Sequence, residues 1–211
     1  MPSESKELAE LMGIIFGDGG INNDWQLVIT LNSIADLEYS KYVRRLLEKL
    51  FGIDVAVRKR PGRNALVLVC SSMNLIDYLV SKGAVRGNKI RQEIDTPNWI
   101  KGNPEFESAF VRGLVDTDGC LYIHQHSIKG VVYKNIGFCF TNFSKKLIIS
   151  VSHILQKFDI KPYVTANGTR IYLYSQKSVL KYLSIFGSSN SRINNKYASW
   201  TKVNKNFQPV L

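Results

Sequence analysis

The segment LMGIIFGDG at residues 11–19 is followed 100 residues later by VRGLVDTDG at residues 111–119. Both segments are mostly apolar, and both end in an Asp-Gly pair. Two copies of one segment in a chain of 211 residues indicate an internal duplication. Duplicated units that pack against each other predict a pseudo-twofold axis, which would bring the two Asp-Gly pairs together.

Other parts of the chain repeat with nearly the same spacing. Residues 50–57 resemble residues 157–164, and the Tyr-Leu pair at 78–79 with Gly83 resembles the pair at 182–183 with Gly187. These offsets, 107 and 104 residues, are typical of a diverged duplication with small insertions. Two units are too few for a solenoid of stacked repeats, so the pattern favours a closed pseudo-dimer.

Each unit shows the same order of hydrophobic patterns, helix-strand-strand-helix-strand-strand-helix. The sequence therefore predicts an α+β fold of two αββαββα repeats, one over residues 1–87 and one over 105–211, joined by a connector at 88–104 that contains prolines and glycines. The patterns assign helices to 5–18, 34–51 and 73–82 and strands to 25–31, 55–58 and 65–70 in the first unit; in the second they assign helices to 105–118, 145–158 and 177–186 and strands to 136–140, 163–165 and 169–174.

The chain is strongly basic, with 28 Lys and Arg against 17 Asp and Glu, a net charge of +11 and a pI near 9.6. This balance favours a polyanionic partner such as nucleic acid, although solubility or attraction to a membrane surface would also fit. No apolar run reaches the ~18 residues of a membrane span. Three cysteines without a CxxC pair, and a polar N-terminal segment without a signal-peptide core, predict an intracellular protein in a reducing compartment. A prokaryotic cytoplasm or nucleoid and an organelle matrix fit equally well.

Small residues recur four positions apart in each repeated segment. Gly13 and Gly17 in the first copy correspond to Gly113 and Thr117 in the second. Residues with this spacing lie on one helix face, where small side chains let two backbones approach closely. We therefore expect the two helices to pack together, with Asp18 and Asp118 at the same end.

Two carboxylates at helix C-termini require a compensating cation. A helix C-terminus carries partial negative charge, and two nearby carboxylates also repel each other. Mg²⁺ prefers oxygen ligands and is commonly held by one or two carboxylates together with phosphate and water. The sequence thus favours a metal site at Asp18 and Asp118, while a simple Asp-Gly turn at each helix end is the alternative.

The two segments resemble the motifs of the LAGLIDADG homing endonucleases in their single-chain, two-repeat form, and the resemblance covers nearly the whole chain. It implies two antiparallel sheets that form a DNA-binding saddle around two central motif helices. It also implies that Asp18 and Asp118, the eighth letters, are catalytic and bind metal, and that the carbonyls of Gly17 and Thr117 bind metal too. The sixth letter, commonly Asp in the family, is Phe16 in the first copy and Asp116 in the second.

The resemblance implies further active-site residues. A basic residue near the cleft assists hydrolysis in the family, which suggests Lys89 and Lys196, although a solvated surface lysine is an equally good interpretation. A polar residue after the second strand positions water, which suggests Asn32 and Asn142. Matching these two asparagines requires an offset of 110 residues, whereas matching the strand phase requires 111. A slip of one residue moves a side chain to the other face of a strand.

The same resemblance places the sheets in the major groove of double-stranded DNA, where base pairs can be distinguished. Because the candidate side chains differ between the units, we expect a long and asymmetric target. A solvated turn is the alternative for the basic cluster at residues 58–60. The candidate DNA-binding residues are Asn22, Asp24, Gln26, Thr30, Arg58, Arg60 and Arg63 in the first unit and Tyr122, His124, His126, Lys134, Arg170, Tyr172 and Tyr174 in the second.

A zinc site is a weaker interpretation of one cluster. Cys120, His124 and His126 share a strand face by parity, but no fourth ligand or CxxC partner accompanies them. Groove-facing side chains explain them more simply, and His153 in a predicted helix is expected to pack or face solvent.

Three functions remain compatible with the sequence. The first is a monomeric Mg²⁺-dependent endonuclease of intron homing, encoded by an intron or free-standing, that makes a staggered double-strand cut, with Mn²⁺ or Ca²⁺ able to occupy its site. The second is a maturase that binds intron RNA, and the third is a DNA-binding relative without catalysis. Two intact acids favour the first, and the absence of protein-splicing flanks disfavours an intein.

Overall fold

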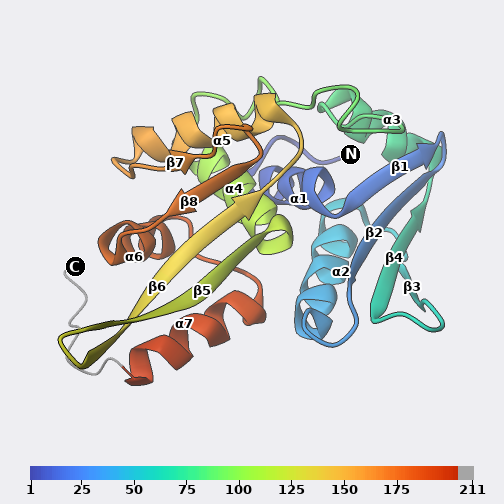
Figure 1. Cartoon of the computed structure of the whole chain (residues 1–211). Coiled ribbons are helices and arrows are strands. Elements are labelled where there is room, and N and C mark those ends of the chain that lie inside the picture. The colour runs from blue at the N-terminus through green and yellow to red at the C-terminus, as the bar shows by residue number, and fades with distance from the viewer. Residues whose placement is uncertain (204–211) are drawn as a thin grey trace.

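The computed structural model describes residues 1–203 and consists of two similar halves, each with a four-stranded antiparallel sheet. The strand orders β1-β2-β4-β3 and β5-β6-β8-β7 are equivalent, so the duplication predicted from the sequence is present in the topology (Figure 1). The first half comprises α1 (Lys6–Gly17), β1 (Gly19–Asn23), β2 (Gln26–Asn32), α2 (Leu37–Phe51), β3 (Ala56–Lys59), β4 (Ala65–Ser71) and α3 (Met73–Ser81). The second comprises α4 (Pro104–Asp118), β5 (Gly119–Ile128), β6 (Val131–Thr141), α5 (Lys145–Lys157), β7 (Tyr163–Val164), β8 (Arg170–Leu173), α6 (Gln176–Ile185) and α7 (Ser191–Val203).

Both halves follow the predicted αββαββα order, with two differences in the second. The β5–β6 hairpin is much longer than the predicted strand at 136–140. An additional helix, α7, which the hydrophobic pattern did not predict, follows α6 and lies against β5. Ile193 and Trp200 of α7 are buried and Tyr197 packs beside them, so the helix has a narrow apolar face in an otherwise polar segment.

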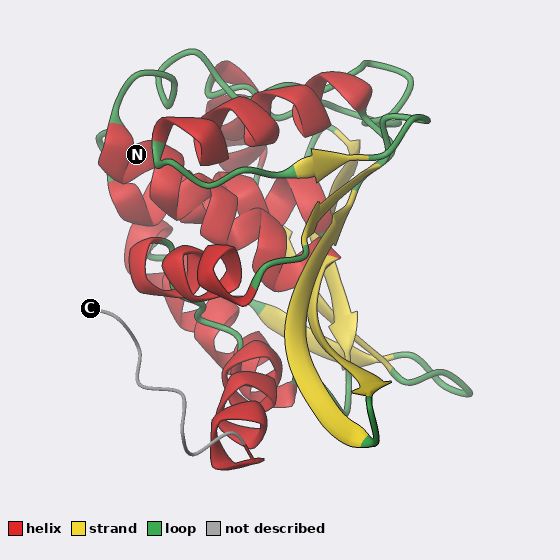
Figure 2. Cartoon of the chain, turned by 60° about the vertical axis from the view of Figure 1, so that its left-hand side comes forward, coloured by secondary structure: helices red, strands yellow, loops and turns green. Residues whose placement is uncertain are grey.

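Each sheet has one face covered by helices and one open face (Figure 2). Alternation along β2 assigns its residues to these faces: Leu27, Ile29 and Leu31 are buried, while the residues between them are partly exposed. The same alternation along β6 buries Ile136, Phe138 and Phe140. Since burial of apolar side chains is the main favourable term in folding, this period-2 pattern fixes which face meets the helices.

The motif helices α1 and α4 pack against each other at the centre of the molecule. An ideal Cβ atom on Gly13 would lie 2.2 Å from the Phe110 carbonyl oxygen, and one on Gly113 would lie 2.2 Å from the Glu10 carbonyl oxygen. Each glycine therefore contacts the backbone of the opposite helix, as the four-residue spacing predicted. None of the helices in residues 1–203 is long and apolar enough to cross a membrane.

Candidate active site

Asp18 and Asp118 lie at the C-terminal ends of α1 and α4, where the two helices meet. Asp18 is the C-cap of α1, and Asp118 is the last residue of α4. An ideal Cβ on Gly17 would lie 3.5 Å from the Asp118 carboxyl carbon and 1.9 Å from the Thr117 hydroxyl oxygen. The bare backbone of Gly17 thus lets the two helix ends, and with them the two acids, come together as expected.

The two carboxyl groups are electrostatically strained. Burial, followed by repulsion from Asp118 and Asp36, raises the pKa of Asp18 to about 7. Burial also raises the pKa of Asp118 to about 6, against the stabilising effects of a hydrogen bond from Asn142 and of the nearby Lys89 ammonium. Acids with raised pKa values in a shared site are a feature of functional centres, because a bound cation would offset both penalties.

Lys89 reaches this site from the segment after α3. Its ammonium donates hydrogen bonds to the carbonyl oxygens of Ile15, Phe16 and Gly17, at 3.0, 2.9 and 2.5 Å. These are unpaired carbonyls of the last turn of α1, where a cation is favoured by the helix dipole. Burial lowers the pKa of Lys89, while both aspartates counteract this effect. The structure therefore brings Lys89 to the two acids.

The second half uses a different residue at the corresponding place. Arg192 of α7 donates to the carbonyl oxygens of Asp116 and Gly119, at 3.2 and 3.1 Å, and its charge lowers the pKa of Asp18. Lys196, one turn further along α7, is exposed, and its charge acts on Cys120 rather than on either acid. Sequence comparison missed Arg192 because α7 was not predicted, although its offset of 103 residues from Lys89 fits the repeat.

The two candidate asparagines also differ between the repeats, because only one of them contacts an acid of the site. Asn142 donates from its side-chain amide to the Asp118 carboxylate at 3.0 Å. Asn32 instead accepts from the backbone N–H groups of Ile34 and Ala35, both at 2.9 Å, in the turn before α2. The strand pairing explains the difference: Gly19 pairs with Ile29 and Gly119 with Phe140, so at this offset of 111 residues Asn142 corresponds to Leu31.

The sixth motif letter also has a defined role. Asp116 is buried and accepts hydrogen bonds from the Ser188 hydroxyl at 2.5 Å and the Ser189 backbone at 2.7 Å. Burial raises its pKa to about 7 despite these bonds. Phe16 at the same position packs edge-on against Phe110 at a centroid distance of 5.6 Å. Asp116 therefore links α4 through hydrogen bonds to the segment that leads into α7. The first repeat has no helix that corresponds to α7.

Most candidate DNA-binding residues lie on or beside the open sheet faces. Strand parity places Gln26, Thr30 and Arg58 on the open face of the first sheet. The prediction for Lys134 is wrong, because Lys134 has the parity of buried Ile136 and its side chain therefore belongs to the helix side of the sheet. The remaining first-unit candidates lie in strand ends and turns (Asn22, Asp24, Arg60, Arg63), and the remaining second-unit candidates follow the open face (Tyr122, His124, His126, Arg170, Tyr172, Tyr174).

The open faces of the two sheets carry different chemistry at matching positions. One rung of the first sheet consists of Gly20, Val28, Val69 and Ala56, joined by successive strand pairing. The matching rung of the second sheet consists of Cys120, Cys139, Tyr172 and Tyr163. The first rung is small and apolar, whereas the second offers thiols and phenols, so the two open faces differ in chemistry at matching positions.

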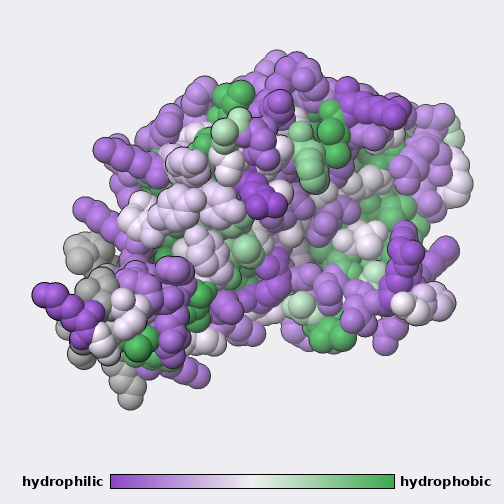
Figure 3. All heavy atoms as spheres, viewed as in Figure 1, coloured by the Kyte–Doolittle hydropathy of each residue, from purple (hydrophilic) through white to green (hydrophobic). Residues whose placement is uncertain are grey.

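Aromatic side chains stack along the second open face. His124 stacks on His126 at 5.5 Å, and His126 stacks on Tyr133 at 5.5 Å. Tyr172 stacks on Tyr174 at 5.3 Å with nearly parallel rings. Within residues 1–203, no cluster of three or more His, Cys, Asp or Glu side chains could hold a metal ion. The face of the molecule seen in Figure 3 is mostly hydrophilic, with hydrophobic side chains in separate patches.

The donor atoms at the helix ends fit a magnesium ion. Two carboxylates and the carbonyls of Gly17 and Thr117 supply the hard oxygen ligands that Mg²⁺ prefers. The Lys89 ammonium already bonds the Gly17 carbonyl, which shows that this position attracts a cation. Two carboxylates with carbonyls and water are sufficient for Mg²⁺, which does not need a third acidic side chain.

Comparison with known proteins identifies similar folds. Residues 105–193 match the model of the LAGLIDADG-like domain. Among curated proteins, none matches the chain in sequence. Similar solved structures include the I-LtrWI LAGLIDADG homing endonuclease bound to target DNA, with a TM-score of 0.62 and 12% identity over 95% of this chain and 91% of that one.

Two further structures are similar over most of their length. The meganuclease I-SmaMI bound to uncleavable DNA has a TM-score of 0.61 and 12% identity over 97% of this chain and 92% of that one. I-DmoI in complex with DNA and Mn has a TM-score of 0.59 and 19% identity over 87% of this chain and 97% of that one. I-DmoI was also solved with DNA and Ca. Residues 105–193 thus match the LAGLIDADG-like domain, and the fold of the chain as a whole is that of the single-chain, two-motif LAGLIDADG homing endonuclease structures.

Proposed function

We propose that this protein is a site-specific homing endonuclease that hydrolyses both strands of double-stranded DNA with Mg²⁺. The observation that carries the proposal is the meeting of Asp18 and Asp118 at the ends of two packed helices, each acid with a raised pKa. Structural neighbours with the same fold were solved on DNA, and I-DmoI with Mn and with Ca, which supports a divalent ion at this site. These DNA complexes give the intron-RNA alternative no support.

The residues at the site have separable roles in this proposal. A divalent ion held by the two carboxylates, with the Gly17 and Thr117 carbonyls, would stabilise charge on the attacking and leaving oxygens of the phosphodiester. Asn142 orients the Asp118 carboxylate through its amide. Lys89 supplies a positive charge beside both acids, where the charge that develops on the phosphate would be stabilised.

DNA binding would be shared between charge and groove contacts. The net charge of +11 favours contact with phosphates, which dominates affinity but carries no sequence information. The side chains on the open sheet faces are the candidates for base contacts. Because the faces differ from rung to rung, the target should be long and asymmetric, with a staggered cut at its centre.

Cleavage of supercoiled plasmid tests the function. The plasmid carries the uninterrupted insertion-site sequence, and wild type, Asp18→Asn and Asp118→Asn are each incubated with Mg²⁺ or Ca²⁺. We expect wild type to linearise the plasmid with Mg²⁺, and each variant to bind the DNA without double-strand cutting. Removal of the metal with EDTA should stop cleavage by wild type. Normal cutting by both variants would remove the two acids from the mechanism.

A further inference from the structure

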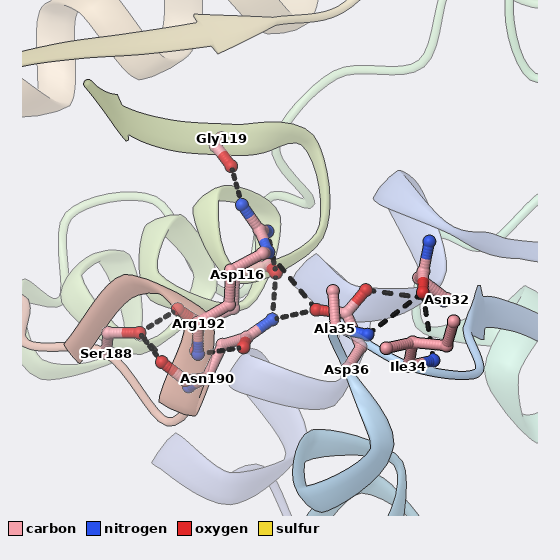
Figure 4. A network of polar contacts seen from close by, with 9 residues as sticks. All are labelled: Asn32, Ile34, Ala35, Asp36, Asp116, Gly119, Ser188, Asn190 and Arg192. Atoms are coloured by element: carbon pink, nitrogen blue, oxygen red, sulfur yellow. Dashed lines mark hydrogen bonds and ion pairs between the residues drawn. The ribbon is translucent and has the colours of Figure 1, made fainter. Parts of the chain in front are cut away.

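The C-terminal turn of α4 is held by an arginine from a distant helix. Arg192 in the first turn of α7 donates from one terminal nitrogen to the Asp116 carbonyl at 3.2 Å and from the other to the Gly119 carbonyl at 3.1 Å. These two carbonyls flank the Thr117-Asp118 segment (Figure 4). A planar guanidinium with fixed donors holds two acceptors in a defined relation, which a lysine cannot do.

Arg192 is itself fixed from the first repeat. Its Nε donates to the Asp36 carboxylate at 3.2 Å, and Asp36 lies directly before α2. Asn190 donates to the same carboxylate oxygen at 2.8 Å and to the Asp116 carbonyl at 2.9 Å. The amide oxygen of Asn190 accepts from the Arg192 backbone at 2.9 Å. Asp36 and Asn190 are buried, so water competes little for the hydrogen bonds of this network (Figure 4).

The first repeat is held in a different way. Lys89 places one point charge on three successive carbonyls of α1, including the Gly17 carbonyl. That carbonyl is a candidate metal ligand, so Lys89 has to share it with a bound ion or leave it. Arg192 instead bonds carbonyls on either side of Thr117 and is tied to Asp36. The two acids therefore have unequal supports.

We propose that Arg192 is a positioning residue for Asp118, acting through the last turn of α4, and that Asp36 and Asn190 hold it in place. The inference rests on the proposed nuclease function. It adds to that function that the two halves of the active site are unequal. Loss of Arg192 should impair the strand cut that depends on Asp118 more than the other strand cut.

Strand-resolved cleavage measures this inequality. The target duplex carries a different label on each strand, and nicking rates are measured for wild type, Arg192→Gln, Arg192→Lys and Asp36→Asn. We expect Arg192→Gln to slow one strand, and always the same strand, on the order of 10–100-fold more than the other, because small misplacement of a reacting group has effects of this size. Nicked DNA should then accumulate. Arg192→Lys keeps the positive charge but loses the two terminal nitrogens that bond the two carbonyls. The ratio of its two strand-cleavage rates should therefore fall between those of wild type and Arg192→Gln.

A matched control separates the positioning role of Arg192 from a general loss of positive charge and from a loss of protein stability. Lys202→Ala removes one positive charge from an exposed position in the last turn of α7. It should lower DNA affinity slightly and keep the wild-type ratio of the two strand rates. Thermal unfolding of every variant identifies general destabilisation, which would slow both strands equally. Equal slowing in Arg192→Gln, or an unchanged ratio, would overturn the proposal.

A crystal structure of Arg192→Gln supplies a readout without activity. We expect the Asp118 carboxylate to lose its 3.0 Å bond with the Asn142 amide while the surroundings of Asp18 stay unchanged. If wild type cuts no DNA but this shift is seen, the nuclease function fails and the positioning role stands. An Asp118 that keeps its place in Arg192→Gln overturns the positioning role whether or not wild type cuts.

Discussion

At the scale of single residues, the central feature is two buried acidic side chains, Asp18 and Asp118, at the meeting point of two helices. Asp18 and Asp118 cost stability when both are ionised, because burial and mutual repulsion oppose the charged form. A bound cation at this site would remove the free-energy penalty of ionising both acids. Lys89 and Arg192 offset part of it through their positive charges on the acids and the helix ends.

Asp18→Asn should stabilise the metal-free protein above neutral pH. The pKa of Asp18 is raised from 3.8 to about 7, so the folded state holds a proton that the unfolded state has already lost. Its penalty is absent below pH 4, grows between pH 4 and 7, and is complete above 7. We expect the Tm of the variant to exceed that of wild type at pH 8 but not at pH 4, by about 2–4 °C for each kcal/mol relieved.

Thermal unfolding in EDTA at both pH values checks this prediction. Asp54→Asn is the control, because the Asp54 side chain is 93% exposed. Its Tm should follow wild type at both pH values. An Asp18→Asn variant with no pH-dependent gain would contradict the raised pKa.

Lys89→Met should move the acid limb of the pH-rate profile to higher pH. The Lys89 ammonium lowers the pKa of both Asp18 and Asp118, so its removal raises both, and the ionised acids needed for metal binding form only at higher pH. Cleavage rates of a labelled target between pH 5 and 9 measure the shift. Lys196→Met should give a smaller shift, because Lys196 acts on Cys120. Equal shifts in the two variants would assign the lysines equal roles.

At the scale of elements, the pairing of α1 with α4 positions the site. Gly13→Ala should destabilise the protein strongly, because its Cβ would lie 2.2 Å from the Phe110 carbonyl oxygen and has only backbone to displace. Overpacking of this kind costs about 1–3 kcal/mol or more. Denaturant unfolding measures the loss, and Gly20→Ala, whose Cβ meets nothing within 4 Å, should leave stability close to wild type. Similar stabilities for both variants would mean that the helices can separate without cost.

The motif helices could be predicted because their requirements appear in the sequence itself. Gly13 and Gly113 recur at the same motif position, and each is needed for close backbone contact. Helix α7 was not predicted, although Ile193, Tyr197 and Trp200 pack against the core at helical spacing, because most of its other residues are polar and its polar contacts reach residues far away in sequence. Arg192 was missed with it. The mismatch of Asn32 and Asn142 arises from hairpins of unequal length, which shift β6 relative to β2.

At the scale of the whole molecule, pseudo-symmetry of the backbone is combined with asymmetry of the surface. The topologies of the two sheets match strand for strand. Their open faces do not, since Val28 and Val69 stand where the second sheet has Cys139 and Tyr172. The candidate Lys134 conflicts with the alternation of its own strand, because it shares the parity of Ile136, Phe138 and Phe140, which are buried.

A palindromic target should therefore bind less well than the natural asymmetric one. We expect duplexes made from either half-site repeated in inverted orientation to lose affinity, because in each of them one of the two open faces meets the half-site that the other face binds. Fluorescence anisotropy in Ca²⁺ measures this, at several salt concentrations because phosphate contacts are salt-dependent. Equal affinity for both palindromes and the natural target would contradict unequal readout by the two sheets.

The most direct test of the account is the anomalous X-ray signal of Mn²⁺ in crystals of the protein bound to its DNA target. The account predicts manganese at the meeting point of α1 and α4, with oxygen ligands from Asp18 and Asp118, and loss of this signal in Asp118→Asn. A saturated complex with manganese elsewhere, or with the two carboxylates turned away from it, would contradict the shared metal site.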